Sequence, residues 1–440
     1  MRHARATVVF VAAALLASLA GCSSGGAPAG SQGSSSANSA PSLQGNPEQA
    51  NLRMTIWSSN AAHLKLLNGI AADYTKLHPG VKVTFDSIVD NYAPTLTTQI
   101  AGGAGPDLAW IGTADAPDFI SAHALVPLTQ ILRSTNGYDF GDLSKVDQAV
   151  YSADDELYAY PFSNSPYAVY ANTDLLAKAN QPSPASLIAS GKWTWDELIS
   201  EAAAVHSATG KAGATFQNFN YQDWTQLEPF WSAYGARPWS ADGKTAEFAS
   251  KERTQAFTVY TKGMAAGAFP QPGTTADFFA GDAAFVITQI SRASLLDGSF
   301  KWDLVPLPTG TIGKYTTMGQ AGIAVLKSSK NTAAATQFLA FMTNPTNSLR
   351  LAAYFPPPRT SQLTADVLKT NNPKLSKEQL QAVVVDAAKN AVSPGAVHTN
   401  FTQIQQAVRA ALDPMWQPGA DPGSVLKQVD ASLQLLLGKK

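Results

Sequence analysis

Cysteine is almost missing from this sequence, because Cys22 is the only one among its 440 residues. A single cysteine so near the start excludes a disulfide framework, a thiolate zinc site, an iron–sulfur cluster and a cysteine nucleophile in the folded body. Charged residues are also scarce, at 14%, and the formal net charge is −1. This balance indicates no nucleic-acid partner, because proteins that bind nucleic acids concentrate positive charge. The 45% of hydrophobic residues predicts folded cores, and the length favours two domains or more.

Clustered metal ligands are missing as well. The histidines at positions 63, 78, 123, 206 and 398 are scattered along the chain. No two of them have the three- or four-residue spacing by which one face of a helix holds a metal ion. We therefore expect no metal centre, and no motif indicates another cofactor.

Catalytic signatures are nearly as scarce. Asp154-Asp155-Glu156 could supply the paired carboxylates that sugar hydrolysis needs. Adjacent side chains on a solvated loop do not converge on one substrate, however. We therefore expect these three residues to form a turn before the segment 157–160.

Long hydrophobic runs are confined to the start of the chain. Residues 1–21 have a basic beginning, an apolar run and small residues, which is the pattern of an export signal, and the run is too short to span a bilayer. Leu19-Ala20-Gly21-Cys22 resembles the lipobox of bacterial lipoproteins, whose cysteine is diacylated and becomes the new N-terminus. Residues 22–50 are mostly small and polar, so we expect a flexible tether with a reach of roughly 30 Å. After residue 50 no apolar stretch is long enough to span a membrane.

Alternating and helical periodicities follow each other after the tether. Strands are predicted at 52–57, 81–85 and 106–111, with amphipathic helices at about 64–77 and 92–101 between them. Strand, helix, strand, helix, strand is an α/β pattern. Ligands bind beyond the carboxyl ends of strands in such sheets, which marks the segments 57–60 and 110–115 as candidate binding residues.

Weaker patterns continue to the end of the chain. Thr194-Trp195-Asp196-Glu197 fits a capping box at the start of a helix that reaches about Val205. Further predictions are a buried strand at 283–287, a strand at 322–326, a helix at about 330–342 and helical structure over the last 50 residues.

Tryptophan is concentrated in one segment, because five of the nine lie between positions 193 and 239. Flat aromatic rings suit sugars, whose axial C–H groups are apolar while their hydroxyls need polar partners around the rim. We expect Trp193 and Trp195 to fill a core. Trp224 lies in a polar stretch, and the sequence is equally consistent with a pocket position and a core position for this residue.

Several spaced segments together resemble family 1 extracellular solute-binding proteins, the carbohydrate-type receptors of ABC importers. The resemblance covers nearly all of residues 52–440, and its order and spacing matter more than any one piece. It rests on Ile100-Ala-Gly-Gly-Ala-Gly-Pro-Asp107-Leu108, Ala159-Tyr160-Pro161 leading to Tyr170-Ala171-Asn172, Trp193-Thr-Trp-Asp-Glu197, Phe279-Ala-Gly-Asp-Ala-Ala-Phe285 and Val305-Pro-Leu-Pro308.

The resemblance implies an α/β fold of the periplasmic-binding-protein type (type II), with two lobes and a hinge of three crossings that closes on ligand. The crossings would fall near Tyr160–Ser165, Val305–Pro306 and Tyr354–Pro358. The first lobe would be residues 51–162 with 305–354, and the second 163–304 with 355–440.

The resemblance also implies ligand contacts at strand ends, at the crossings and on the Trp-rich segment. In this sequence these positions hold Trp57, Asn60, Trp110, Asp115, Asn164, Trp224, Trp231, Gln289, Arg292, Gln320 and Arg359. Two departures argue against a long glucan: Ser291-Arg292 replaces an aromatic residue usual in maltodextrin receptors, and Gln405-Gln406 stand where such receptors stack a ring. Arg292 and Arg359 are able to pair with an anionic group.

The sequence therefore predicts a receptor without catalytic activity that binds a mono- or disaccharide, or an amino sugar. It would be monomeric, anchored by a lipid on Cys22 at the extracytoplasmic face of the cell membrane, and would deliver its ligand to the transmembrane subunits of an ABC permease. Two alternatives stay open: a glycerophosphodiester or sugar-phosphate receptor, and a lipid-anchored glycosidase.

Overall fold

The computed structural model of the chain describes residues 49–392 and 395–437. The predicted signal at 1–21, Cys22 and all but the last two residues of the predicted tether lie outside the described residues. These described residues belong to one compact unit. No helix of its described part is both long enough and apolar enough to cross a membrane.

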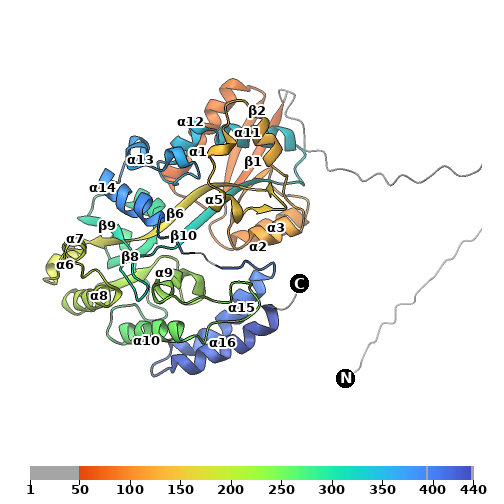
Figure 1. The fold of residues 1–440 in the computed structure, drawn as a ribbon. Coiled ribbons are helices and arrows are strands. Elements are labelled where there is room, and N and C mark those ends of the chain that lie inside the picture. Colours follow the sequence, from red (N-terminus) through yellow and green to blue (C-terminus); the bar gives the residue numbers. More distant parts are fainter. Residues whose placement is uncertain (1–48, 393–394, 438–440) are drawn as a thin grey trace, which may run out of the picture. The chain divides into compact units, whose positions relative to one another are not determined.

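Eight strands of this unit form one mixed sheet (Figure 1). Their spatial order is β2, β1, β3, β10, β6, β8 and β7, and β9 also pairs with β6. A separate hairpin joins β4 and β5. The strands are β1 (Ala50–Ile56), β2 (Val81–Ser87), β3 (Leu108–Gly112), β4 (Ser152–Ala153), β5 (Glu156–Leu157), β6 (Tyr160–Asn172), β7 (Ala212–Phe216), β8 (Ala283–Gln289), β9 (Trp302–Pro306) and β10 (Met318–Val325).

The first three strands and the helices between them confirm the predicted α/β pattern. β1 lies parallel to both β2 and β3, and the connections are α1 (Ala61–Leu77) and α2 (Tyr92–Ala101). Asn60 starts α1, because its side-chain oxygen accepts hydrogen bonds from the backbone N–H groups of Ala62 and His63. The carboxyl ends of β1 and β3 therefore lie at one edge of the sheet, where ligands bind in α/β proteins.

Strand β6 is the longest, with 13 residues, and belongs to both halves of the sheet. Residues from Tyr160 to Pro166 pair with β10. Residues from Tyr167 to Asn172 pair with β8 and β9. One continuous strand therefore connects the two halves.

Three hydrophobic clusters divide this unit into two lobes. The first cluster is built from β1, β3, β10 and their helices, and we call the part around it the first lobe. The other two pack on β6, β8 and β9, and we call the part around them the second lobe. Leu307 and Tyr315 belong to a second-lobe cluster, whereas β10 begins at Met318. This packing favours a second crossing near Met318 over one at Val305–Pro306.

The helices follow the same division. Those of the second lobe come from the middle and from the end of the chain, where α15 and α16 form the predicted helical terminus (Figure 1). Beside α1 and α2, the first lobe contains α3 (Ala116–Ser121), α4 (Thr129–Ser134), α5 (Lys145–Ala149), α11 (Thr332–Met342) and α12 (Pro345–Leu351). The others are α6 (Thr173–Lys178), α7 (Pro184–Ala189), α8 (Trp195–Thr209), α9 (Glu228–Trp231), α10 (Lys251–Ala265), α13 (Ala365–Asn371), α14 (Lys377–Leu380), α15 (Phe401–Leu412) and α16 (Pro422–Leu437).

Candidate functional site

A cleft of about 1520 Å³ lies between the two lobes. Its walls come from the ends of β1 and β3 in the first lobe, from the segments after β7 and β8 in the second, and from β6 and β10. Six residues that the resemblance assigns to the ligand line this cleft: Trp57, Asn60, Trp110, Gln289, Arg292 and Gln320. The other five are not among its lining residues: Asp115, Asn164, Trp224, Trp231 and Arg359.

The first-lobe wall is aromatic. Trp57 directly follows β1, and Trp110 lies within β3 and is only 1% exposed. The Trp57 ring packs edge-on against Trp110, with ring centres 5.0 Å apart, and against Tyr92 at 5.2 Å. These two contacts hold the half-buried Trp57 indole in place, and its remaining surface faces the cleft.

Polar contacts at the start of α1 join the two lobes. Asn60 Nδ2 donates to the hydroxyl of Ser294, 3.1 Å away, in the short 3₁₀ segment that follows β8. The same hydroxyl lies 3.2 Å from Nε2 of His63, whose Nδ1 is 2.8 Å from the Ser58 hydroxyl. Ser294 is thus the second-lobe end of a small interlobe hydrogen-bond network.

His63 bridges these hydroxyls as a neutral group. Burial lowers its pKa to about 4, and the positive charge of Arg292 acts in the same direction. The Ser294 hydroxyl is also within hydrogen-bond distance of the carbonyl of Ser291, and the roles of donor and acceptor at His63 depend on which ring nitrogen carries the proton. The ring also packs on Phe355, at 4.8 Å between ring centres. These contacts therefore explain the buried position of His63 without a metal ion.

Gln289 and Arg292 form the second-lobe wall at the end of β8. Gln289 pairs with Tyr167 of β6 in the sheet register. Its side chain lies against the backbone of Gly319 in β10, where an added Cβ would collide with the Gln289 amide. Glycine at position 319 therefore lets this amide lie across the strand that reaches into the first lobe.

Gln320 and Asn164 lie on neighbouring strands beneath the cleft. Gln320 Nε2 donates to Asn164 Oδ1 at 2.8 Å and to Asp147 Oδ1 at 3.2 Å. Asn164 is only 4% exposed, and its own amide donates to the carbonyl of Pro161. Asn164 thus orients Gln320, which is the member of this pair that lines the cleft.

Asp115 lies in the first lobe at the start of α3. Burial, together with the nearby charge of Asp118, raises its pKa to about 6. Its carboxylate accepts no hydrogen bond from any other residue of 49–392 and 395–437. A partly buried acid without a donor is costly, so this carboxylate is a candidate acceptor for hydroxyl groups brought by a ligand.

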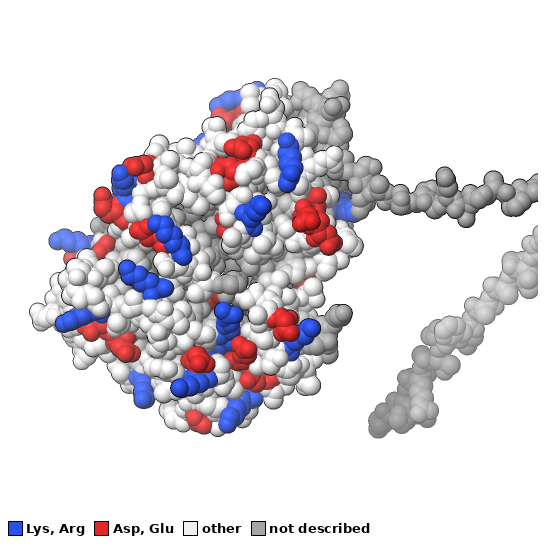
Figure 2. Space-filling model, viewed as in Figure 1, with Lys and Arg blue, Asp and Glu red and all other residues white. Residues whose placement is uncertain are grey.

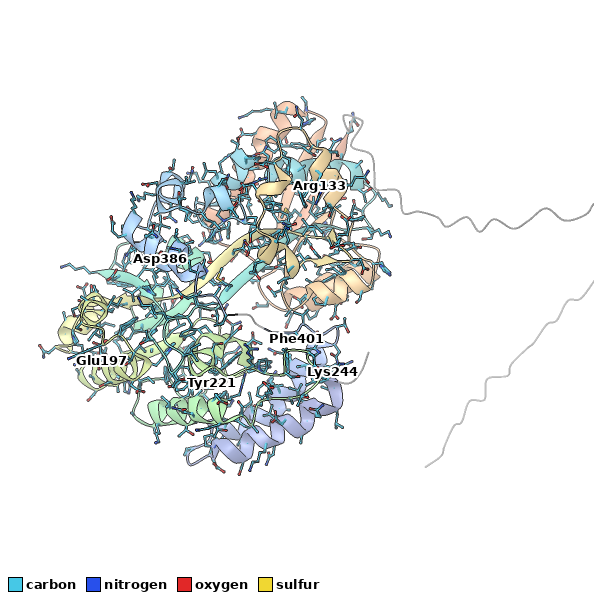
Figure 3. The ribbon with its side chains drawn as sticks, viewed as in Figure 1. Arg133, Glu197, Tyr221, Lys244, Asp386 and Phe401 are labelled. Atoms are coloured by element: carbon cyan, nitrogen blue, oxygen red, sulfur yellow. The ribbon has the colours of Figure 1, made fainter. Side chains whose placement is uncertain are left out.

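Trp224 and Trp231 lie in the second-lobe core, and each is 4% exposed. Trp224 packs on Phe248 and on Phe401, which Figure 3 labels at the start of α15. The guanidinium of Arg253 lies 4.1 Å from the centre of the Trp231 ring. Both indoles are therefore already covered by protein, as are Trp193 and Trp195, which fill the core as predicted.

Arg359 is completely buried and already has its partners. Its guanidinium donates to the carbonyls of Tyr138, Asp139 and Thr343, at 2.8 to 3.1 Å, and lies 3.9 Å from a carboxylate oxygen of Asp142. Its charge is thus used to hold together segments of the first lobe. In this arrangement it is not available to a solute in the cleft.

Other lining residues come from second-lobe segments that the sequence predictions missed. Tyr221, labelled in Figure 3, follows β7 on a loop with positive φ, and its hydroxyl donates to the carbonyl of Pro270. The sequence signal for these residues is the polar and aromatic run that follows β7. Because the periodicity did not predict β7, this run was not recognised as a strand-end segment. These missed residues include Tyr167, Gln217, Asn218, Phe219, Asn220, Tyr221, Asp223, Gln226, Tyr260, Phe278, Phe279 and Ser294.

Asp154 and Asp155 form the predicted turn between β4 and β5, and Glu156 is the first residue of β5. Asp154 and Asp155 have φ angles of 50° and 61°, so they occupy the left-handed region that tight hairpins need. Glu156 Oε1 accepts a hydrogen bond from the backbone N–H of Thr129. None of the three lines the cleft.

Charged side chains of both signs are interspersed over the face seen in Figure 2. The described part of this face carries no broad patch of one sign.

Comparisons with known proteins agree on one family. Residues 57–348 match the family described as bacterial extracellular solute-binding protein. An uncharacterised lipoprotein of Streptomyces antibioticus is 25% identical over 379 residues, which cover 79% of this chain and 75% of that protein.

Solved structures show a similar fold. An ABC substrate-binding protein of Listeria monocytogenes, in complex with cycloalternan, matches with a TM-score of 0.78 and 22% identity, over 89% of this chain and all of that one. UgpB of Mycobacterium tuberculosis, in complex with glycerophosphocholine, has a TM-score of 0.71 and 18% identity, over 88% of this chain and 98% of that one. These similarities establish the two-lobe fold.

Proposed function

The chain belongs to the family of bacterial extracellular solute-binding proteins, and on this premise we propose that it is the substrate-binding receptor of an ABC importer. Its solute is a small carbohydrate, a mono- or disaccharide or an amino sugar, held between the lobes. The observation that carries this proposal is a cleft of about 1520 Å³ lined from both lobes by aromatic rings and side-chain amides. That volume exceeds the range of about 300–1,000 Å³ typical of small-molecule pockets, so more than one ring fits.

The lining residues suit the two faces of a sugar. The indole of Trp57 would cover the apolar C–H face of a ring, and its contacts with Trp110 and Tyr92 fix its orientation in advance. The amides of Gln289 and Gln320 would meet hydroxyl groups as donors or acceptors.

A thermal-shift screen of neutral mono- and disaccharides tests the proposed function. A solute at 100 times its dissociation constant is expected to stabilise the protein by about 2.7 kcal/mol. A panel of amino acids serves as the control, and these should leave the melting temperature unchanged. If no carbohydrate-type solute stabilises the folded protein, the proposal fails.

We propose that the receptor does not hydrolyse its solute. The support is the position of Asp154, Asp155 and Glu156, in the β4–β5 hairpin and away from the cleft. Mass spectrometry of the best solute after incubation with purified protein should find no product above background. Turnover that disappears in Asp154→Asn or Glu156→Gln would instead support the glycosidase alternative.

We propose that the receptor acts as a monomer anchored through a lipid on Cys22, from which it delivers the solute to its permease. The support is the lipobox-like segment 19–22 and the lipoprotein among the relatives. Cys22→Ala should leave unprocessed or shed protein. If this variant remains with washed membranes as the wild type does, the anchoring proposal is wrong.

A further inference from the structure

Arg292 is a positively charged residue of the cleft wall that has no hydrogen-bond or ion-pair partner among the described residues. It lies in the 3₁₀ segment Ile290–Leu295 that follows β8, and it is partly buried. No ion pair among the described residues includes Arg292. Its guanidinium also makes no hydrogen bond to any of these residues.

The surroundings of Arg292 do not neutralise its charge. The ionisable groups that act on its pKa are the phenols of Tyr167 and Tyr170, and burial raises the pKa of both, so they are uncharged. His63, whose pKa lies at about 4, is neutral as well. The burial of Arg292 lowers its own pKa, which means that the folded protein disfavours its charge.

The two acids of the second-lobe wall are already engaged elsewhere. Asp223 accepts hydrogen bonds from Thr225, Gln226 and Gln405. Asp277 caps the short segment after it by accepting from the N–H of Phe279. The remaining acid of the lining, Asp90, is exposed on the first lobe. A partner for Arg292 is therefore missing from the protein side of the cleft.

The two completely buried arginines, Arg253 and Arg359, do not line the cleft. Arg359 has three carbonyl acceptors and lies near Asp142. The guanidinium of Arg253 lies over the rings of Trp231 and Phe248. Arg292 alone of the three faces the cleft, so a group that enters the cleft can reach it.

We propose that the solute carries an anionic group, a phosphate or a carboxylate, and that this group pairs with the guanidinium of Arg292. This inference rests on the proposed function and narrows its substrate class to acidic sugars and sugar phosphates. A guanidinium presents N–H donors in a planar fork that matches two oxygens of a phosphate or a carboxylate. The amide of Gln289 lies on the same wall and can donate to a further oxygen.

Matched pairs of probes test the inference by calorimetry. Each pair shares a carbon skeleton and differs in charge: glucuronate with glucose, and glucose 6-phosphate with glucose. The anionic member of at least one pair should bind wild-type protein roughly 10- to 100-fold more tightly than its neutral partner. The glucuronate and phosphate pairs distinguish a carboxylate from a phosphate as the group recognised.

Variants of Arg292 test whether its guanidinium causes the preference for the anionic probe. Arg292→Gln should abolish the preference for the anionic probe, and Arg292→Lys should retain part of it. Arg237→Gln is the matched control, because Arg237 is exposed and does not line the cleft. Arg292→Gln should also melt at a higher temperature than ligand-free wild type, because it removes an unpaired buried charge.

The outcomes separate the inference from the proposed function. If neutral sugars bind and no anionic partner binds more tightly, the inference is wrong and the proposed function stands. An anionic preference that survives in Arg292→Gln also overturns the inference. If no probe binds but a neutral sugar of the thermal-shift screen stabilises the protein, only the inference fails. If no solute of either experiment binds, both the inference and the proposed function fail.

Discussion

Arg359→Gln is expected to lower the stability of the folded protein by about 3–5 kcal/mol, because it breaks a buried charge network. The variant leaves the carbonyls of Tyr138, Asp139 and Thr343 without their shared donor and leaves Asp142 without its nearby charge. Thermal unfolding followed by circular dichroism measures the change.

Arg237→Gln is the control for this experiment, because an exposed arginine should change stability by less than about 0.5 kcal/mol. If Arg359→Gln does not fold, Asp142→Asn perturbs the same network more gently and should still lower the melting temperature. A variant at Arg359 that keeps wild-type stability and loses only solute binding would contradict this account of the residue.

Trp57→Ala is expected to weaken solute binding roughly 10- to 150-fold while the protein stays folded. The expected loss corresponds to about 1.5–3 kcal/mol of apolar contact with the solute. Trp57 is half-buried and lies at the cleft, so most of its free surface would be covered by the solute. Calorimetry with the best solute of the screen measures the change.

Trp224→Phe is the matched comparison. Its indole is 4% exposed, packs on Phe248 and does not line the cleft. This variant should lose stability and keep its affinity. The reverse pattern, with affinity lost in Trp224→Phe and kept in Trp57→Ala, would assign the stacking role to the second-lobe indole.

The elements of the first lobe could be predicted because their signals are local. The alternation from Leu52 to Trp57 and the helical spacing up to Leu77 each lie within one element, and β1 and α1 follow them closely. Asn60, at the junction, also has a local role as the cap of α1. The strand-end rule then placed Trp57 and Asn60 at the cleft, where both are found.

The residues that sequence reasoning could not place depend on distant partners. Nothing near Arg359 in the sequence reveals that carbonyls of Tyr138 and Asp139, more than 200 positions earlier, meet its guanidinium. Trp224 lies in a polar stretch, yet Phe248 and Phe401 cover its ring. A tertiary contact decides burial in both cases, and periodicity carries no information on it.

Ser294 shows the same limit at the cleft. A serine in a short polar segment has no distinctive pattern, but the fold brings its hydroxyl to 3.1 Å from the amide of Asn60 in the other lobe. The missing ion pair of Arg292 is likewise visible only once all neighbouring acids are placed.

Small-angle X-ray scattering, with and without the best solute of the screen, tests most directly the central claim that the solute binds between two lobes that close on it. A receptor that buries its ligand between two lobes becomes more compact on binding. The radius of gyration should therefore decrease at saturating solute and stay unchanged with a solute that does not bind. An unchanged scattering curve, at a saturation proven by calorimetry, would contradict the claim and place the solute in a rigid site or outside the cleft.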